Sequence, residues 1–292
     1  MTIKVRKLSY ALGAQVSGVD LTQPLPEPVK AAILQAWLEH QVLVFPEQEL
    51  GAKQLAAFGM MFGELDTHLA AVDYMHPDSP GVYLITNRKI RGQPSETRDT
   101  GRLWHSDHSF TTRPTMATML HCIDMPEVGG NTLFANMYMA YEALSDTMQR
   151  TLESLEAVHS FGHYVSINPH LQKRNKGQTE THVKRTPPVV HPIVRVHPVT
   201  GRKALYVSEG YTSHIAGMTR EESRGLLEFL FRHSVRPEFT YRHAWTRKEL
   251  LMWDNRCVLH LAPADYSHED TRHMHRVTVL GTPLGHVLDE AA

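Results

Sequence analysis

Apolar residues recur along parts of the chain at helical spacing. In residues 27–40 they return every three to four positions, which predicts a helix with one buried face. The same spacing predicts further helices at 51–62, 145–157 and 219–233. The last helix opens with Thr219 and Glu222, the spacing of a capping box in which each side chain satisfies the other residue's backbone donor.

Between and after these helices the pattern changes to short apolar or alternating runs separated by turn residues. They predict strands at 41–45, 81–86, 115–123, 131–135, 189–197, 203–208, 238–245, 250–254, 257–261 and 273–281. Many short strands without regular alternation of strand and helix are typical of a β-sandwich or jelly-roll barrel. We therefore expect a mainly β fold with flanking helices, in a single domain over 1–292.

Two polar, basic stretches are predicted to be long loops. Residues 88–102 contain five basic side chains and lead directly into the motif described below, which favours a lid over an active site. For residues 165–188 a lid and a plain insertion are equally good interpretations.

Composition and charge exclude several classes of protein. Among the 292 residues, 41 % are apolar and 21 % charged, and the formal net charge of −1 favours neither nucleic acid nor an anionic membrane surface as a partner. The two cysteines cannot form a disulfide framework, so we expect a reduced, cytoplasmic setting. No run of about 18 apolar residues predicts a membrane span.

The 20 histidines raise the question of a metal site. Two histidines and one carboxylate on one side of an iron atom leave positions open for a co-substrate and O₂. His-X-Asp on a strand would place both side chains on the same face. The short pattern is a weak signal, since about one match is expected by chance. The chain contains His76-Pro-Asp78, His105-Ser-Asp107 and His268-Glu-Asp270.

Context favours the second of these motifs. The first contains a proline and runs into Ser-Pro-Gly, so it is predicted to form a turn. The third lies in a polar segment close to the end of the chain. His105-Ser-Asp107 is flanked by Trp104 and Phe110, as expected for a half-buried strand, and it has most of the β half downstream.

His260 is the best candidate for the third ligand. A strand, a tight turn at Asp254-Asn255 and a second strand would return it to the interior. The alternative is an ordinary core histidine. The next segment favours the ligand, because strand alternation from 272 to 276 puts Arg272 and Arg276 on one face.

Two buried arginines would need anionic partners, since an unpaired interior charge is costly. A dianionic co-substrate and an anionic substrate would each supply one. The alternative is an edge strand whose arginines are solvated.

Together these segments resemble the taurine dioxygenase and 2,4-dichlorophenoxyacetate dioxygenase family. The resemblance runs from Leu12 to Gly281. It is carried by Trp104-His-Ser-Asp107, by the turn Gly129-Gly-Asn-Thr132, by Trp253-Asp-Asn-Arg-Cys-Val-Leu-His260 and by Met274-His-Arg276.

The resemblance implies a double-stranded β-helix (jelly roll) with Fe(II) held by His105, Asp107 and His260. It further implies that Thr132 and Arg272 bind the distal carboxylate of the co-substrate 2-oxoglutarate, a good match for a bidentate arginine contact. Arg276 and His68 would then contact the anionic group of the substrate.

The reaction implied is hydroxylation of a small anionic organic substrate by O₂, with decarboxylation of 2-oxoglutarate to succinate and CO₂. Alkyl sulfonates, alkyl sulfates and aryloxyalkanoates all fit, and the family suggests a homodimer or homotetramer. Ala71 and the segment Thr100-Gly-Arg-Leu103 depart from the pattern of the taurine enzymes, which argues against taurine itself.

Three alternatives are weighed against this function. A related halogenase would lack the carboxylate ligand, and Asp107 argues against it. A cupin-type metalloenzyme of another chemistry would not need Thr132, Arg272 and Arg276. A non-catalytic binding protein on the same scaffold stays open, because a fold does not fix a function.

Overall fold

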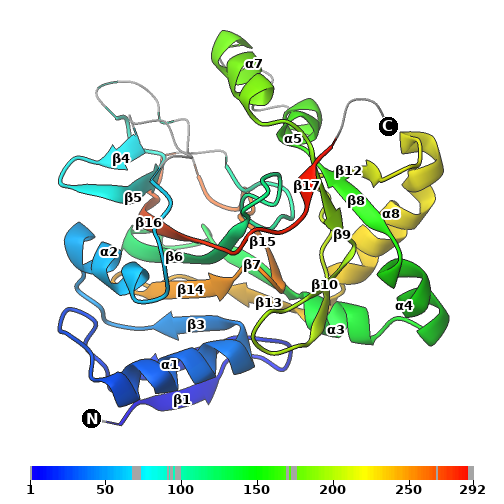
Figure 1. Ribbon diagram of the computed structural model, residues 1–292. Helices are drawn as coiled ribbons and strands as arrows, with labels where there is room; N and C mark the ends of the chain where they lie inside the picture. The colour runs from blue at the N-terminus through cyan, green and yellow to red at the C-terminus, as the bar shows by residue number, and fades with distance from the viewer. Residues whose placement is uncertain are drawn as a thin grey trace.

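The described part of the chain forms four β-sheets with helices around them (Figure 1). The computed structural model describes residues 2–67, 74–90, 92, 95, 100–168, 171, 176–267 and 269–288. Among the helices in these ranges, none is both long enough and apolar enough to cross a membrane.

The largest sheet has eight strands and provides one wall of the interior. Its neighbours are antiparallel except for β2 and β3, which run parallel. In spatial order the strands are β1 (Lys4–Lys7), β2 (Ala14–Ser17), β3 (Val42–Phe45), β14 (Leu250–Asp254), β6 (Thr115–Asp124), β16 (His273–Leu280), β5 (Ser79–Thr86) and β4 (Met75–His76). Strand β16 is paired on both sides, so the edge-strand alternative for the arginine segment is wrong.

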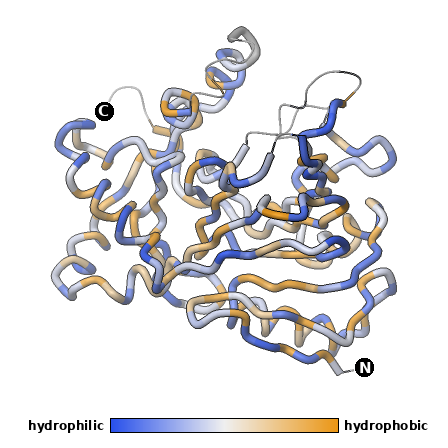
Figure 2. The backbone as a smooth tube through the Cα atoms, turned by 180° about the vertical axis from the view of Figure 1, so that it is seen from behind, coloured by the Kyte–Doolittle hydropathy of each residue, from blue (hydrophilic) through white to orange (hydrophobic). Residues whose placement is uncertain are grey.

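Helices α1 (Glu27–His40) and α2 (Ala52–Met60) cover the outer face of this sheet (Figure 1). Side-chain alternation along β14 explains why both faces are apolar. Leu250 and Met252 pack toward α1 and α2, whereas Leu251 and Trp253 face the interior. In Figure 2 the central strands are accordingly mostly orange and the outer turns mostly blue.

A three-stranded sheet faces the interior side of the large sheet. It consists of β13 (Thr240–His243), β7 (Thr132–Asn136) and β15 (Val258–Leu261). Phe134 and Val258 from this sheet share one apolar cluster with Trp253 and Met274 from the large sheet. The chain crosses from β14 to β15 through the turn at 255–257, so this turn joins the two walls.

The remaining elements form a second lobe beside these sheets (Figure 1). Its strands are β8 (Glu156–His159), β9 (Val189–Pro192), β12 (Thr212–Ile215), β17 (His286–Val287), β10 (Val194–Val196) and β11 (Lys203–Leu205). Its helices are α3 (Met137–Glu142), α4 (Asp146–Glu153), α5 (Phe161–Ile167), α7 (Lys176–Arg185), α8 (Arg220–Ser234) and the short 3₁₀ helix η3 (Pro237–Phe239).

The prediction of a mainly β fold with flanking helices is confirmed. Helix α1 spans the predicted residues 27–40, and α8 begins with the predicted capping box. The Thr219 hydroxyl accepts from the Glu222 backbone N–H at 3.2 Å, and the Glu222 carboxylate accepts from the Thr219 N–H at 2.8 Å.

Several predictions of local structure need correction. The predicted helix at 145–157 ends at Glu153, and residues 156–157 belong to strand β8. The segment 189–197 is two strands, because the backbone leaves β9 at Pro192 and Ile193 instead bonds to Leu155. The segment 238–245 starts as η3 because Pro237 fits the first position of a helical turn. The predicted loop at 165–188 contains the end of α5 and all of α7. Helix α7 is polar almost throughout, so it has no apolar stripe to signal it.

Candidate active site

His105, Asp107 and His260 come together between the two facing sheets. All three side chains are buried, and one ligand atom from each lies within 4.8 Å of the other two. The Nε2 atoms of His105 and His260 each lie 3.7 Å from Oδ1 of Asp107. The structure therefore gathers the three residues that the sequence predicts as ligands.

The backbone achieves this differently from the prediction, because His105-Ser-Asp107 is not part of a regular strand. His105 makes a single β-bridge with His260, in which each residue donates its N–H to the other's carbonyl at 3.1 and 2.9 Å. A turn follows at once, and the Asp107 N–H donates to Oδ1 of Asn255 at 3.1 Å. One bridge and one turn, rather than strand alternation, aim the carboxylate at the two imidazoles.

Both imidazoles are in the form that binds metals. Nδ1 of His105 lies 2.7 Å from the Leu103 carbonyl, which can only accept, so Nδ1 carries the proton and Nε2 presents a lone pair. Burial lowers the pKa of His105, and burial together with the neighbouring His105 lowers the pKa of His260 well below its usual value. Both rings are thus neutral near pH 7.

Asp107 is held as a carboxylate. Burial opposes its ionisation, but the positive charge of Arg276 keeps its pKa well below the usual range. Nη2 of Arg276 lies 3.0 Å from Oδ1, and the Thr118 hydroxyl donates to Oδ2 at 2.6 Å. Two neutral imidazoles and one carboxylate are a donor set that suits a divalent transition metal such as iron(II).

In a second buried group, His197, Asp254 and Cys257, the possible ligand atoms also lie within 4.8 Å of one another, but Asp254 and His197 already have hydrogen-bond partners within the protein. Asp254 accepts from Nε and Nη2 of Arg256 at 2.7 and 2.6 Å. Nδ1 of His197 accepts two backbone N–H groups, so its Nε2 carries the proton and donates to Asp254 at 3.1 Å. This group fixes the turn between β14 and β15.

Arg272 immediately precedes β16 and is 7 % exposed. Its Nε donates to the Gly130 carbonyl at 3.1 Å, two residues before the buried Thr132. Among the described residues, no carboxylate lies within ion-pair distance of Arg272, and burial lowers its pKa. The hydroxyl of Thr132 accepts from the indole N–H of Trp245 at 3.0 Å, a partner that the sequence did not indicate.

Arg276 lies four residues after Arg272, within β16, on the face of the strand that points into the interior. Its Nε donates to the Thr278 hydroxyl at 3.1 Å while Nη2 reaches Asp107. His68, the other predicted substrate contact, lies outside the described residues, as do His268 and much of 88–102. His76 ends β4, and the predicted turn follows at 77–78.

An aromatic wall beside the three candidate ligands was missed from the sequence. It comprises Phe110, Tyr164 and Tyr211, which form one buried cluster. The ring centroid of Tyr211 lies 5.8 Å from that of His105 and 4.8 Å from that of Phe110. The three residues are far apart in the sequence, so only the fold brings them together.

His108 is a further residue that the sequence did not single out. It adopts a left-handed backbone conformation with φ of 53°, which is uncommon for a residue with a side chain. Its Nδ1 lies 2.9 Å from the Thr115 hydroxyl and 3.6 Å from a carboxylate oxygen of Asp66. These contacts hold the strained turn that immediately follows Asp107.

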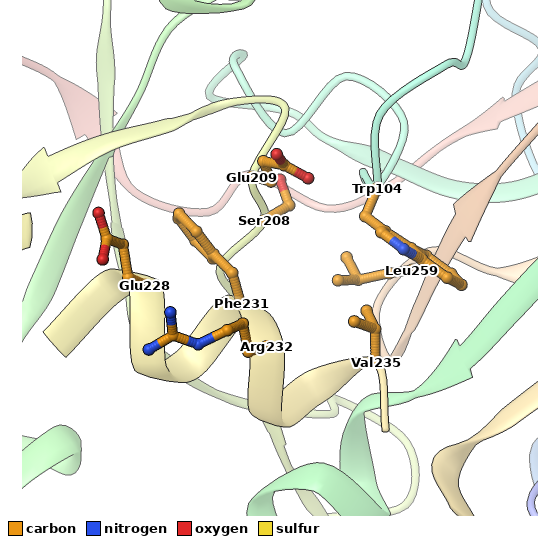
Figure 3. Close-up of a pocket in the computed structure, with 8 residues that line it drawn as sticks. All are labelled: Trp104, Ser208, Glu209, Glu228, Phe231, Arg232, Val235 and Leu259. Carbon is orange, nitrogen blue, oxygen red and sulfur yellow. The ribbon is translucent and has the colours of Figure 1, made fainter. Parts of the chain in front are cut away.

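A pocket of about 210 Å³ lies next to the ligand-bearing segments (Figure 3). It is lined by Trp104 and Leu259, which directly precede His105 and His260, and by Phe231 and Val235 at the end of α8. None of the three candidate ligands lines this pocket, so it is separate from the candidate metal site.

Comparison with known proteins agrees with this geometry. Residues 4–278 match the model of the family described as "Taurine catabolism dioxygenase TauD, TfdA family". The alpha-ketoglutarate-dependent 2,4-dichlorophenoxyacetate dioxygenase of Cupriavidus pinatubonensis is 33 % identical over 290 residues, with 96 % of this chain and 98 % of that protein covered. The alkylsulfatase of Acinetobacter baylyi is 30 % identical, with 96 % and 85 % covered.

Among solved structures, AAD-2 in complex with Mn(II) and N-oxalylglycine is 33 % identical to this chain. Its TM-score is 0.82, with 97 % of this chain and 99 % of that chain covered. The family match spans nearly the whole chain, and the relatives are matched over most of their own length. The chain therefore belongs to the TauD, TfdA family and is an alpha-ketoglutarate (2-oxoglutarate)-dependent dioxygenase.

Proposed function

We propose that this dioxygenase uses iron(II), bound by His105, Asp107 and His260, to hydroxylate a small anionic organic substrate. The observation that carries the proposal is the convergence of two neutral imidazoles and one carboxylate, with Nη2 of Arg276 3.0 Å from the same carboxylate. The candidate metal ligands and a candidate anion-binding arginine thus lie side by side.

Iron(II) in this site would supply the activation of O₂ that the protein's own side chains lack. The contribution of the chain is to hold three ligands on one side, to keep both imidazoles neutral and to exclude water. Two interactions hold the ligand atoms in place in the metal-free protein. They are the β-bridge between His105 and His260 and the hydrogen bond from Thr118 to Asp107.

Arg272 and Thr132 would bind the distal carboxylate of 2-oxoglutarate. A buried guanidinium with no carboxylate partner among the described residues requires an anion, and a bidentate contact suits a carboxylate. The backbone contact to Gly130 and the indole of Trp245 orient the two binding groups toward the interior.

Arg276 would bind the anionic group of the substrate, with His68 as its partner. The apolar body of the substrate would then lie against Phe110, Tyr164 and Tyr211. An aromatic wall favours an aryloxyalkanoate, an alkyl sulfate or a longer alkyl sulfonate over taurine, whose ammonium group would gain nothing from it. Such substrates are named among the chain's relatives, a 2,4-dichlorophenoxyacetate dioxygenase and an alkylsulfatase.

We further propose that the two facing sheets form a double-stranded β-helix, and that 1–292 is a single catalytic domain. A cytoplasmic homodimer or homotetramer is the assembly that the family resemblance supports.

Succinate release in air with iron(II) and 2-oxoglutarate tests the proposal. The panel should contain taurine, longer alkyl sulfonates, alkyl sulfates and aryloxyalkanoates, with uncharged alcohols and esters of the same skeletons as controls. We expect turnover only with the anions, and faster turnover with those that have an apolar body. Acceleration by the uncharged analogues, or succinate release independent of added iron, would contradict it.

A further inference from the structure

We propose that Trp253, Asn255 and Thr118 form a one-way chain of hydrogen bonds that makes Oδ1 of Asp107 its only metal-binding oxygen. These are positioning residues, and the inference rests on the proposed role of Asp107 as a metal ligand. Thr118 lies on β6, Trp253 on β14 and Asn255 in the turn that leads to β15. The chain of bonds therefore links two strands of the large sheet through the turn that joins the two walls.

The orientation of the Asn255 amide is fixed by two donors. Its Oδ1 accepts from the indole N–H of Trp253 at 3.1 Å and from the backbone N–H of Asp107 at 3.1 Å. Neither group can act as an acceptor, so the amide cannot be reversed. The Asn255 NH₂ group must then point at Thr118, whose hydroxyl oxygen lies 3.0 Å from Nδ2.

This orientation decides where the hydroxyl hydrogen of Thr118 points. Because the oxygen of Thr118 receives a hydrogen from Asn255, its own hydrogen is free to be donated elsewhere. Oδ2 of Asp107 lies 2.6 Å away and, as a carboxylate oxygen, can only accept. All four residues are at most 3 % exposed, so water does not compete for these bonds.

As a consequence, the two oxygens of the Asp107 carboxylate have different roles. Oδ2 is occupied by a short, charge-assisted hydrogen bond. Oδ1 accepts no such bond from a hydroxyl of the described residues and faces Nε2 of both His105 and His260, with Nη2 of Arg276 beside it at 3.0 Å. A carboxylate that binds through one oxygen occupies one position on a metal, and one that binds through both occupies two. This chain of hydrogen bonds would thus leave open the coordination positions on the metal that 2-oxoglutarate and O₂ require.

Co²⁺, which binds such sites without turning over O₂, provides the test. Thr118→Val removes the hydroxyl and nearly keeps the shape, and we expect a 10- to 100-fold loss of Co²⁺ affinity, the order expected for an outer-sphere partner. The Co²⁺ absorption spectrum should change as well, and added 2-oxoglutarate should perturb it less than in wild type. Thr118→Ser retains the donor and should restore affinity and spectrum.

Two comparisons separate positioning from simple stability. Ser223→Ala deletes a buried hydroxyl on α8, far from the site, and should lower stability without changing Co²⁺ binding. Trp253→Phe should weaken Co²⁺ binding less than Thr118→Val does, and should have no additional effect in the Thr118→Val background, because both act through one chain.

The proposal would be overturned if Thr118→Val kept the Co²⁺ affinity and spectrum of wild type while losing stability as Ser223→Ala does. Additive effects of Trp253→Phe and Thr118→Val would do the same. Failure of the proposed metal site would look different, since His105→Ala would then bind Co²⁺ as tightly as the unmodified protein.

Discussion

Nη2 of Arg276 lies 3.0 Å from Oδ1 of Asp107, the oxygen that also lies 3.7 Å from Nε2 of His105 and of His260. One carboxylate oxygen is therefore shared between the candidate metal site and the candidate substrate arginine. A substrate anion that draws Arg276 toward itself would alter the charge felt by Asp107. This arrangement offers a physical link between substrate binding and the metal.

Alanine at His105, Asp107 or His260 should abolish metal binding and turnover. Each variant removes one of three ligand atoms, so the loss of Co²⁺ affinity should exceed the 10- to 100-fold typical of outer-sphere changes. Equilibrium titration with Co²⁺ and iron content after purification measure the effect. His76→Ala, at the edge of the large sheet, should behave like wild type. Full activity in His260→Ala would show that another residue is the third ligand.

Arg272→Ala should raise the KM for 2-oxoglutarate. The loss of a charge-assisted, bidentate contact costs on the order of 2–3 kcal/mol, which corresponds to a change of about 30- to 150-fold. Steady-state succinate release, with 2-oxoglutarate varied at saturating substrate, gives the value. Arg242→Ala removes an exposed arginine that pairs with Asp265 and should leave this KM unchanged. A normal KM in Arg272→Ala would remove this residue from the co-substrate site.

Arg276→Ala should uncouple the two half-reactions. Without the Arg276 guanidinium the substrate anion would bind weakly, whereas Arg272 and Thr132 would still bind 2-oxoglutarate. We expect slow succinate formation with little hydroxylated product, and a ratio of product to succinate well below the wild-type value. Both products are quantified as each ligand is titrated. A change in the 2-oxoglutarate dependence alone would mean that the roles of the two arginines are exchanged or shared.

Stability should fall on acidification because of His191. Burial, with Arg195 nearby, lowers the pKa of His191 to about 4 from its usual 6.5. The unfolded chain therefore takes up a proton below pH 6.5 that the folded protein takes up only near pH 4, so stability is lost as the pH falls through this window.

His191→Gln removes this source of pH dependence. Between pH 7.5 and pH 5, wild type should lose about 2 kcal/mol more of its free energy of unfolding than the variant does. Urea unfolding at the two pH values measures the difference. His76→Gln, on β4 of the large sheet, serves as the control and should follow wild type. An equal loss in wild type and His191→Gln would assign the acid sensitivity to other groups.

Local sequence signals determined much of the secondary structure. The helical repeat at 27–40, the capping box at Thr219 and the strand at 250–254 lie where predicted, because each depends on contacts between residues close in the chain or on a strong apolar period. Helix α7 and the short strands β8 and β12 were not predicted, since a polar helix or a short strand with several polar residues carries too little pattern.

The candidate ligands and arginines were found from the sequence because their chemistry limits the residue types, and because strand spacing relates Arg272 to Arg276. Their assembly was decided only by tertiary structure. His105 meets His260 through one long-range bridge, and Asp107 is aimed by Asn255 and Thr118, which belong to other elements. The aromatic wall of Phe110, Tyr164 and Tyr211 is likewise assembled only by the tertiary structure. Contacts between residues so distant in the chain leave no local periodicity, so the fold alone specifies them.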